Sequence, residues 1–166
     1  PRGEVYALVG DGTYLLSPAE LVTALQEQLK ITVVLCENHG YQSIRRLQMG
    51  RAGRSFGNEF RHRDPGTNRL EGDYIALDLA QNAAGLGART WRVATPAELQ
   101  RALREARDEA RTCVIVAEVE KHRYQPDSEV WWDVAAAEAS QDPLTQDLRR
   151  QYEQGRDRLQ RYYSGS

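Results

Sequence analysis

Short apolar runs alternate along the chain with longer segments in which apolar residues recur at helical spacing. The apolar runs predict strands over residues 4–9, 31–36, 89–93 and 112–120. Helical spacing predicts helices over residues 18–29, 41–48, 74–86 and 96–110. A repeated strand–helix alternation is typical of a parallel sheet with helices on both faces. The pattern therefore predicts the α/β class, with a doubly wound parallel sheet.

Signals at the helix ends support these boundaries. Ser17-Pro18-Ala19-Glu20 and Thr95-Pro96-Ala97-Glu98 both match a capping box with proline at the first helical position, and so predict two helix starts. Gly87 follows the helix predicted over 74–86, and glycine is favoured just after a helix. One stripe of the helix predicted over 18–29 is apolar, which indicates the side that packs on the sheet: Leu21, Leu25 and Leu29.

The last predicted strand ends at residue 120 and divides the chain into two parts. Residues 1–120 are expected to form the α/β domain, and residues 121–166 an extension with two adjacent tryptophans and a helix over about 143–163. Within the α/β domain, residues 50–72 are rich in Gly and Arg and lack sustained periodicity. Loops of this length are usually functional or disordered, so this stretch is predicted to be a lid that orders when ligand binds.

Composition narrows the function without identifying it. With 166 residues the chain can bury one core, and a net charge of −2 gives no electrostatic case for binding nucleic acid or a membrane surface. No apolar run reaches the roughly 18 residues of a membrane span, and no signal peptide is recognised. Cys36 and Cys113 lie in apolar runs and are expected to be buried thiols, consistent with a cytoplasmic protein.

Two strand ends carry the residues with the clearest chemistry. Gly10-Asp11-Gly12 follows the first predicted strand, and Asn38 follows the second. Parallel strands place their carboxyl ends at one edge of a sheet, so the carboxylate and the carboxamide are expected to face the same crevice. Mg²⁺ prefers such oxygen ligands together with substrate phosphates. Gly-Asp-Gly is also ordinary turn chemistry, so a plain loop is the alternative.

This strand–Gly-Asp-Gly–helix–strand–Asn arrangement resembles the cofactor motif of thiamine diphosphate-dependent enzymes. The resemblance implies three Mg²⁺ ligands, which are the side chains of Asp11 and Asn38 and the backbone carbonyl of Gly40. It implies that thiamine diphosphate lies against the same two loops, at Gly10, Asp11, Gly12, Thr13, Asn38, His39, Gly40 and Tyr41. The glycines are expected to let the backbone turn sharply towards the diphosphate. The N-terminus of the helix predicted over 18–29 is expected to stabilise the negative charge of the diphosphate.

The later part of the α/β domain strengthens the resemblance. Family members carry a helix with the pattern D-x-x-x-x-A-x-x-x-G, and residues 78–87 match it. In the family, a glutamate on a separate pyrimidine-binding domain of a partner subunit activates the cofactor, and no acidic residue here matches that motif. The resemblance therefore implies a domain that is incomplete at its N-terminal side, works with missing N-terminal domains in a homo-oligomer, and contributes no catalytic acid or base.

Within the family, three segments resemble the hydrolases that open a cyclic trihydroxy dione in myo-inositol catabolism: residues 10–24, 38–44 and 126–134. The last segment is distinctive because it holds adjacent tryptophans. This resemblance implies a cyclic polyhydroxy diketone as substrate and hydrolysis of one of its C–C bonds. An acetolactate-synthase-like lyase or transferase and a non-catalytic phosphate-binding α/β domain stay open as alternatives.

Other polar and aromatic residues carry weaker patterns. Glu37 stands where many family members have asparagine, and a solvated loop charge is expected. His39 is either a site residue or a solvent-facing loop residue, whereas His62 and His122 lack metal-ligand spacing. Core or interface positions are expected for three aromatic residues, Trp91, Trp131 and Trp132. A solvated or subunit-facing surface is expected, with an anion-binding surface as the alternative, for six arginines: Arg45, Arg46, Arg51, Arg54, Arg61 and Arg63.

The chain by itself is expected to be inert and to self-associate. An uncovered strand edge is a template for pairing with another chain, and surfaces meant for missing domains expose apolar side chains. One face of the C-terminal helix is suited to docking on such surfaces, with Leu144, Leu148, Tyr152 and Leu159.

Overall fold

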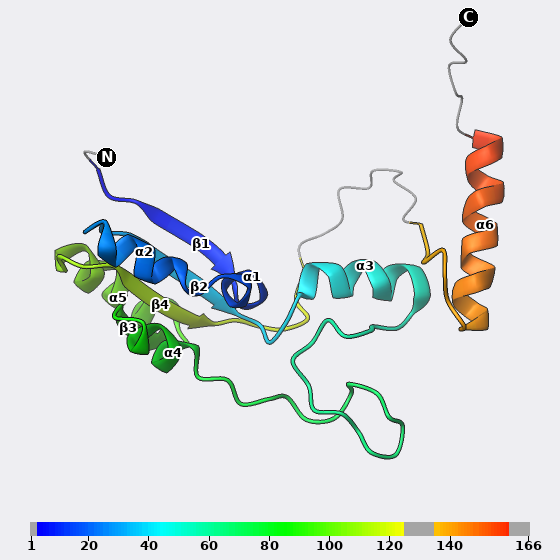
Figure 1. Cartoon of the computed structure of the whole chain (residues 1–166), viewed down its shortest axis with the longest axis horizontal. Coiled ribbons are helices and arrows are strands. Elements are labelled where there is room, and N and C mark those ends of the chain that lie inside the picture. Colours follow the sequence, from blue (N-terminus) through cyan, green and yellow to red (C-terminus); the bar gives the residue numbers. More distant parts are fainter. Residues whose placement is uncertain (1–2, 125–134, 160–166) are drawn as a thin grey trace, which may run out of the picture. The chain divides into compact units, whose positions relative to one another are not determined.

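The structure, a computed structural model, describes residues 3–124 and 135–159 (Figure 1). Its strands are β1 (Tyr6–Gly10), β2 (Thr32–Glu37), β3 (Arg89–Val93) and β4 (Cys113–Glu118). Its helices are α1 (Asp11–Leu16), α2 (Glu20–Gln26), α3 (Gln42–Ala52), α4 (Leu79–Gly85), α5 (Pro96–Asp108) and α6 (Pro143–Leu159). The strands form one sheet in the order β1-β2-β4-β3, with every pair parallel. The predicted α/β class with a doubly wound parallel sheet is confirmed.

Two compact units make up the chain, and each is described by itself. The first, Pro1–Gln42 with Gly57–Arg123, contains the sheet and the helices that cover it. The second, Ser43–Phe56 with Tyr124–Ser166, contains most of α3 and all of α6. The division of the chain at residue 120 stays a prediction. The segment 126–134, with Trp131 and Trp132, lies outside the residues that the structure describes.

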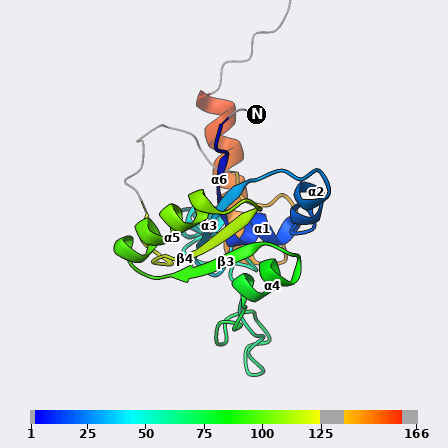
Figure 2. The same ribbon diagram turned by 90° about the vertical axis from the view of Figure 1, so that its left-hand side faces the viewer.

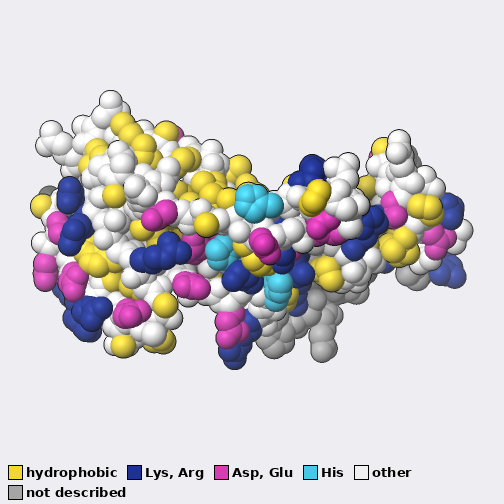
Figure 3. All heavy atoms as spheres, turned by 90° about the horizontal axis from the view of Figure 1, so that it is seen from below, with side chains coloured by type: hydrophobic (Ala, Val, Ile, Leu, Met, Phe, Trp, Pro, Cys, Tyr) yellow, Lys and Arg dark blue, Asp and Glu magenta, His cyan; other side chains and the backbone are white. Residues whose placement is uncertain are grey.

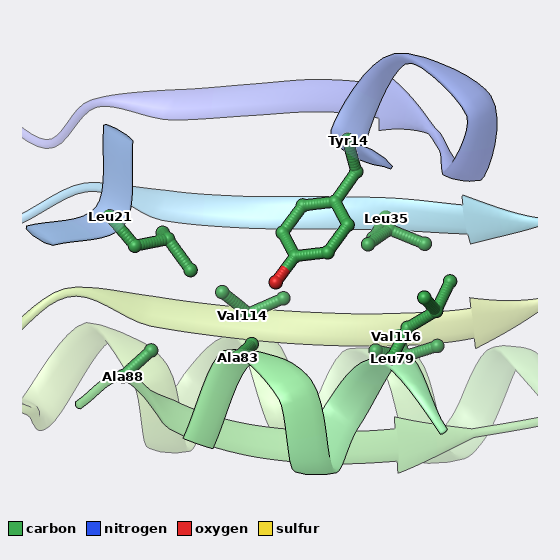
Figure 4. Close-up of a cluster of buried hydrophobic side chains, with 8 residues drawn as sticks. All are labelled: Tyr14, Leu21, Leu35, Leu79, Ala83, Ala88, Val114 and Val116. Carbon is green, nitrogen blue, oxygen red and sulfur yellow. The ribbon is translucent and has the colours of Figure 1, made fainter. Parts of the chain in front are cut away.

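One face of the sheet carries the larger core, under α1, α2 and α4 (Figure 2). Alternate strand residues point to this face, and Leu35, Val114 and Val116 are completely buried there. The helices close over them with Tyr14, Leu21, Leu79 and Ala83, and Ala88 joins this core from the turn before β3 (Figure 4). Tyr14 also places its hydroxyl 2.7 Å from Asn82 Oδ1, so its one polar atom is satisfied. Each large aliphatic side chain buried in this way contributes about 1.5–3 kcal/mol.

The opposite face is covered by α5, which packs on β3 and β4 (Figure 2). Ala102 and Ala106 of α5 are small enough to let the helix approach Cys113 and Ile115, which are fully buried. Trp91 packs at the border of this core, as predicted for a core aromatic. On the edge strand β1, Leu8 keeps 74% of its surface exposed.

The helix predicted over 18–29 is present but shorter, as α2, and a helix that was not predicted, α1, precedes it. α1 begins at Asp11 itself and ends before Pro18, since the residue before a proline is driven out of the helical region; Ser17 has φ −154° and ψ 60°. α2 then runs over Glu20–Gln26 with Ala19 as its N-cap. The capping box expected at Ser17 is absent there, whereas the one at Thr95 is present in α5.

Two other predicted helices change length. The helix predicted over 74–86 shrinks to α4, because Asp78 caps it by accepting a hydrogen bond from Gln81 N at 2.9 Å. Tyr74 is drawn instead into an antiparallel bridge with Arg61. The helix predicted over 41–48 extends to Ala52, so the irregular segment starts later than expected, at residue 53. That this segment is a ligand-ordered lid stays a prediction.

The six arginines predicted to share a surface are divided between the two units and make internal contacts. In the second unit, Arg51 donates to the carbonyl of Leu148, and Arg54 pairs with Asp142 near the start of α6. In the first unit, Arg61 pairs with Glu59. These three arginines therefore form hydrogen bonds or ion pairs with other residues of their own unit.

The cysteines are free thiols, as predicted. Cys113 is buried and Cys36 is half-buried, and burial raises the pKa of both thiols. Among the described residues, no helix combines the length and the apolar character needed to cross a membrane.

The two capping sequences give a matched test of the helix starts. Replacing Thr95 with alanine removes the bond to Glu98 N at 3.3 Å and is expected to lower the free energy of unfolding by about 1 kcal/mol. Ser17→Ala is the control, because the Ser17 hydroxyl makes only an exposed 3.5 Å contact with Glu20, and its effect should stay within about 0.5 kcal/mol. Urea unfolding of both variants measures the difference, and equal losses would contradict the assignment.

Candidate metal and cofactor site

The residues singled out from the sequence meet at the carboxyl edge of the sheet. β1 ends at Gly10 and β2 at Glu37, and the register pairs Gly10 with Cys36. Asp11 and Asn38 therefore follow neighbouring parallel strands at the same edge, where open α/β sheets bind ligands. This juxtaposition was predicted from the strand order and is confirmed.

The carboxylate of Asp11 is 1% exposed and is held by backbone N–H groups. Its Oδ2 accepts from Asn38 N at 2.9 Å, and its Oδ1 accepts from Gly12 N at 2.7 Å. Gly40 N lies 3.3 Å from Oδ1 and 3.2 Å from Oδ2. These bonds orient the carboxylate and tie the end of β1 to the loop that follows β2.

The side chain of Asn38 brings a third group to the same point. One terminal atom of its carboxamide lies 3.3 Å from Asp11 Oδ1 and 2.9 Å from the carbonyl oxygen of Gly40. Both neighbours are acceptors, so in the absence of a cation this atom is the amide nitrogen, which donates to both. With a cation among the three groups the oxygen can occupy this position instead, because the positive charge takes the place of the amide protons.

The spacing of these groups suits a small divalent cation. Magnesium–oxygen distances of about 2.1 Å put neighbouring oxygens of an octahedral shell about 3.0 Å apart, close to the separations around Asn38. In the described part of the chain, no group of three His, Cys, Asp or Glu side chains could hold a metal. A cation here would therefore depend on one carboxylate, one carboxamide and one carbonyl, with the remaining ligands supplied by a bound phosphate or water.

The loop after Asn38 adopts a conformation that requires glycine. His39 has φ 59° and Gly40 φ 147°. A Cβ at Gly40 would lie 2.2 Å from the carbonyl oxygen of Asn58 and 2.8 Å from Glu59 Cα, so no larger residue fits. Two bonds fasten this loop to the segment after α3: Tyr41 N donates to Asn58 O at 2.7 Å, and Phe60 N donates to His39 O at 3.0 Å.

Gly10 and Gly12 do not form the sharp turn that the sequence predicts. Gly10 has φ −81° and ψ 159°, an ordinary extended conformation, and Gly12 is already in α1. No sharp glycine turn is therefore present at these two residues. A Cβ at Gly12 would lie 2.7 Å from the Tyr41 ring, so this glycine lets the two loops approach. A Cβ at Gly10 would meet nothing within 4 Å, and Thr13 is exposed, which leaves open space at the start of α1.

Glu37 was predicted to be a solvated loop charge, and this is wrong. Glu37 is the last residue of β2 and is 1% exposed. Its Oε2 forms an ion pair with Arg92 on β3, whereas its Oε1 has no hydrogen-bond partner among the described residues. Burial raises the pKa of Glu37, and the Arg92 guanidinium opposes that rise. Glu37 and Glu118 are neighbours in the parallel register, so Arg92 lies at an edge with two acidic residues.

A polar cluster beside His39 was not expected from the sequence. Glu59 forms an antiparallel bridge with Gly40, and its carboxylate contacts Tyr74, His122 and Arg61. The ring of His39 lies 5.2 Å from the ring of Tyr74. His39 is thus half-buried between the predicted ligands and this cluster, and no local sequence spacing connects Glu59 to His122, which lies 63 residues later.

Comparison with known proteins shows the family of the chain. The family model "Thiamine pyrophosphate enzyme, C-terminal TPP binding domain" matches residues 1–117. The chain belongs to this family. It is 41% identical to 3D-(3,5/4)-trihydroxycyclohexane-1,2-dione hydrolase 2 of a Bacillus cereus strain, over 97% of this chain and 24% of that protein. It is 42% identical to the 3D-(3,5/4)-trihydroxycyclohexane-1,2-dione hydrolase of a second Bacillus cereus strain, over 88% of this chain and 23% of that protein.

Two solved structures share the fold. Benzoylformate decarboxylase from Polynucleobacter necessarius matches with a TM-score of 0.61 and 24% identity, over 74% of this chain and 20% of that one. The thiamine diphosphate-dependent 4-hydroxybenzoylformate decarboxylase of Rhodococcus jostii RHA1 matches with a TM-score of 0.59 and 21% identity, over 72% of this chain and 20% of that one. The chain spans about a quarter of the length of its curated relatives.

The contribution of the Glu37–Arg92 ion pair to the stability of the fold can be tested by substitution. Arg92→Ala leaves a buried carboxylate without its counter-charge and is expected to lower the free energy of unfolding by about 1–3 kcal/mol. Arg89→Ala is the control, because the Arg89–Glu109 pair is exposed at 3.6 Å and contributes about 0–1 kcal/mol.

Adding Glu37→Gln to the Arg92→Ala variant removes the unpaired charge and should recover part of the lost stability. Thermal or urea unfolding of the unchanged protein, Arg92→Ala, Glu37→Gln and the double variant completes the cycle. A double variant less stable than Arg92→Ala alone would show that the buried charge is not the cause.

Proposed function

We propose that this chain is the cofactor-anchoring C-terminal part of a longer thiamine diphosphate-dependent enzyme. In this proposal Asp11, Asn38 and the carbonyl of Gly40 hold Mg²⁺, and the metal holds the diphosphate. The observation that carries it is the convergence of three ligand groups at separations of 2.9 and 3.3 Å around Asn38. Membership of the family and its relatives' greater length support it.

The surrounding residues have proposed roles that follow from their positions. Gly10 and Thr13 border the open space at the start of α1, where a diphosphate can approach the backbone. Gly12 and Tyr41 pack against each other and hold the two loops together. His39 lies between the metal ligands and the polar cluster around Glu59, which supports a role as a polar contact to the cofactor.

We further propose that the whole enzyme hydrolyses a C–C bond of a trihydroxycyclohexane-1,2-dione, and so opens the ring in myo-inositol catabolism in the cytoplasm. Support comes from relatives with this name at 41–42% identity over most of the chain. When bound, thiamine diphosphate supplies a nucleophilic carbon and an electron sink. This chain's part is to fix the charged end of the cofactor, while the missing N-terminal domains and a second subunit complete the site.

The metal assignment is tested on the full-length enzyme by titration with thiamine diphosphate and Mg²⁺. Asp11→Asn keeps the shape of the side chain but removes the only charged protein ligand, so we expect cofactor affinity to fall at least about 10-fold and turnover to be lost. Asp108→Asn, an exposed change at the end of α5, is the control and should bind normally. Unchanged cofactor affinity in Asp11→Asn would overturn the assigned role.

The 166-residue chain alone is expected to self-associate and to be inactive on the dione. β1 is an edge strand, and Tyr6 and Leu8 expose 49% and 74% of their surface on it. Light scattering should therefore report a dimer or larger species. A monomer would contradict the exposed-edge argument, and dione hydrolysis by this chain would contradict the need for further domains.

A further inference from the structure

Four side chains of the first unit form a connected group that we call the Glu59 cluster: Glu59, Arg61, Tyr74 and His122. The Glu59 side chain is 9% exposed. Its Oε1 accepts from the Tyr74 hydroxyl at 2.5 Å and lies 3.0 Å from His122 Nε2. Its Oε2 lies 3.4 Å from Arg61 Nε. A nearly buried carboxylate thus has its oxygens fixed by three partners from three parts of the chain.

The Glu59 cluster lies at the same edge of the sheet as the proposed metal ligands. Glu59 bridges Gly40 through the backbone, and the Tyr74 ring is 5.2 Å from that of His39. His122 follows β4, whose carboxyl end is at this edge. In Figure 3, histidine side chains lie among acidic and basic side chains on the face shown.

Within the Glu59 cluster, His122 is the most exposed member. Its side chain is 44% exposed, against 9% for Glu59 and 23% for Arg61. The guanidinium carbon of Arg61 lies 3.8 Å from the centre of the Tyr74 ring, and this cation–π contact stabilises both side chains in their orientation. The less exposed members of the Glu59 cluster thus contact one another and support one exposed imidazole.

The contact with Glu59 also fixes the state of that imidazole. A carboxylate is an acceptor only, so Nε2 of His122 carries the hydrogen that it donates to Glu59. In the neutral ring the other nitrogen, Nδ1, then has a lone pair on the opposite side. A carboxylate that orients an imidazole in this manner is the arrangement in which histidine acts as a general base.

We propose that His122, positioned by Glu59, is a general acid–base residue for the hydrolysis, in place of the expectation that this part of the enzyme contributes none; this rests on the proposed function. Nδ1 takes a proton from water as the water oxygen bonds to a carbonyl carbon of the dione. The C–C bond to the second carbonyl carbon then breaks, and its electron pair passes to that carbon, for which bound thiamine diphosphate would supply the electron sink. The imidazolium returns the proton to that carbon, so one water is consumed and a carboxylic acid and a C–H bond are formed.

The competing explanation is that the Glu59 cluster only fastens the segment after α3 to the end of β4. That role predicts a loss of stability without a specific loss of turnover when His122 is changed. A catalytic role predicts a fall in kcat with KM and cofactor affinity nearly unchanged.

The experiment uses the full-length enzyme with Mg²⁺, thiamine diphosphate and the cyclic dione. His122→Gln is expected to lower kcat at least about 100-fold, with KM and cofactor affinity within about 2-fold of the unchanged enzyme. Arg123→Gln is the matched control, because Arg123 is next to His122 in the chain, its side chain is 79% exposed and lies outside the Glu59 cluster, and the variant should keep full activity. Added imidazole should restore part of the activity of His122→Ala, and Glu59→Gln should lower kcat by a smaller factor than His122→Gln.

The outcomes separate the two levels of the proposal. If the unchanged enzyme hydrolyses the dione and His122→Gln keeps its kcat, the role of His122 is overturned and the proposed function stands. A His122→Ala variant that has lost activity and is not rescued by imidazole also counts against the acid–base role. If the unchanged enzyme binds thiamine diphosphate but does not hydrolyse the dione, the proposed function is overturned and the role of His122 with it.

Discussion

The buried carboxylate of Asp11 is the group on which the arrangement of the site depends. A charge with 1% exposure costs several kcal/mol unless it is hydrogen-bonded or paired. Here the compensation comes from the backbone N–H groups of Gly12, Asn38 and Gly40. Two of these groups belong to the loop after β2, so the carboxylate is stabilised only when β1 and β2 pair in their parallel register. Folding of the sheet and formation of the site are in this sense one event.

The loop after β2 is constrained from its other side by packing. Gly40 leaves no room for a side chain beside Asn58, and its neighbour His39 has a left-handed backbone. The segment that supplies Asn58 also supplies Glu59, whose carboxylate reaches the chain after β4 through His122. The same loop thus connects the proposed metal ligands to the Glu59 cluster at one edge of the sheet.

Features set by local sequence were predictable. The apolar runs located all four strands to within two residues, and β3 agrees at both ends. The Thr95 capping box fixed the start of α5. Asp11 and Asn38 were placed together because parallel strands share a carboxyl edge, an inference that needs only strand order. α1 was missed because Gly-Asp-Gly has the composition of a turn, whereas Asp11 takes the first helical position after Gly10.

Features set by distant partners were not predictable. From the sequence alone, Glu37 is expected to be a charged loop residue. In the fold, β3 places Arg92, which lies 55 residues later in the chain, beside its carboxylate. The sequence pattern predicts that Tyr74 begins a helix. In the fold its hydroxyl instead bonds to Glu59, and its ring contacts the Arg61 guanidinium. In both cases a tertiary contact outweighs a local preference that is worth only a fraction of a kcal/mol per residue.

The claim that Asp11, Asn38 and Gly40 hold a divalent cation is tested most directly by anomalous diffraction. The full-length enzyme would be crystallised with thiamine diphosphate and Mn²⁺ in place of Mg²⁺. The account predicts a single anomalous peak at coordination distance from the Asp11 carboxylate, the Asn38 side-chain oxygen and the Gly40 carbonyl, with the cofactor's diphosphate completing the shell. A peak elsewhere with the cofactor bound, or an Asn38 nitrogen still facing Asp11, would contradict it.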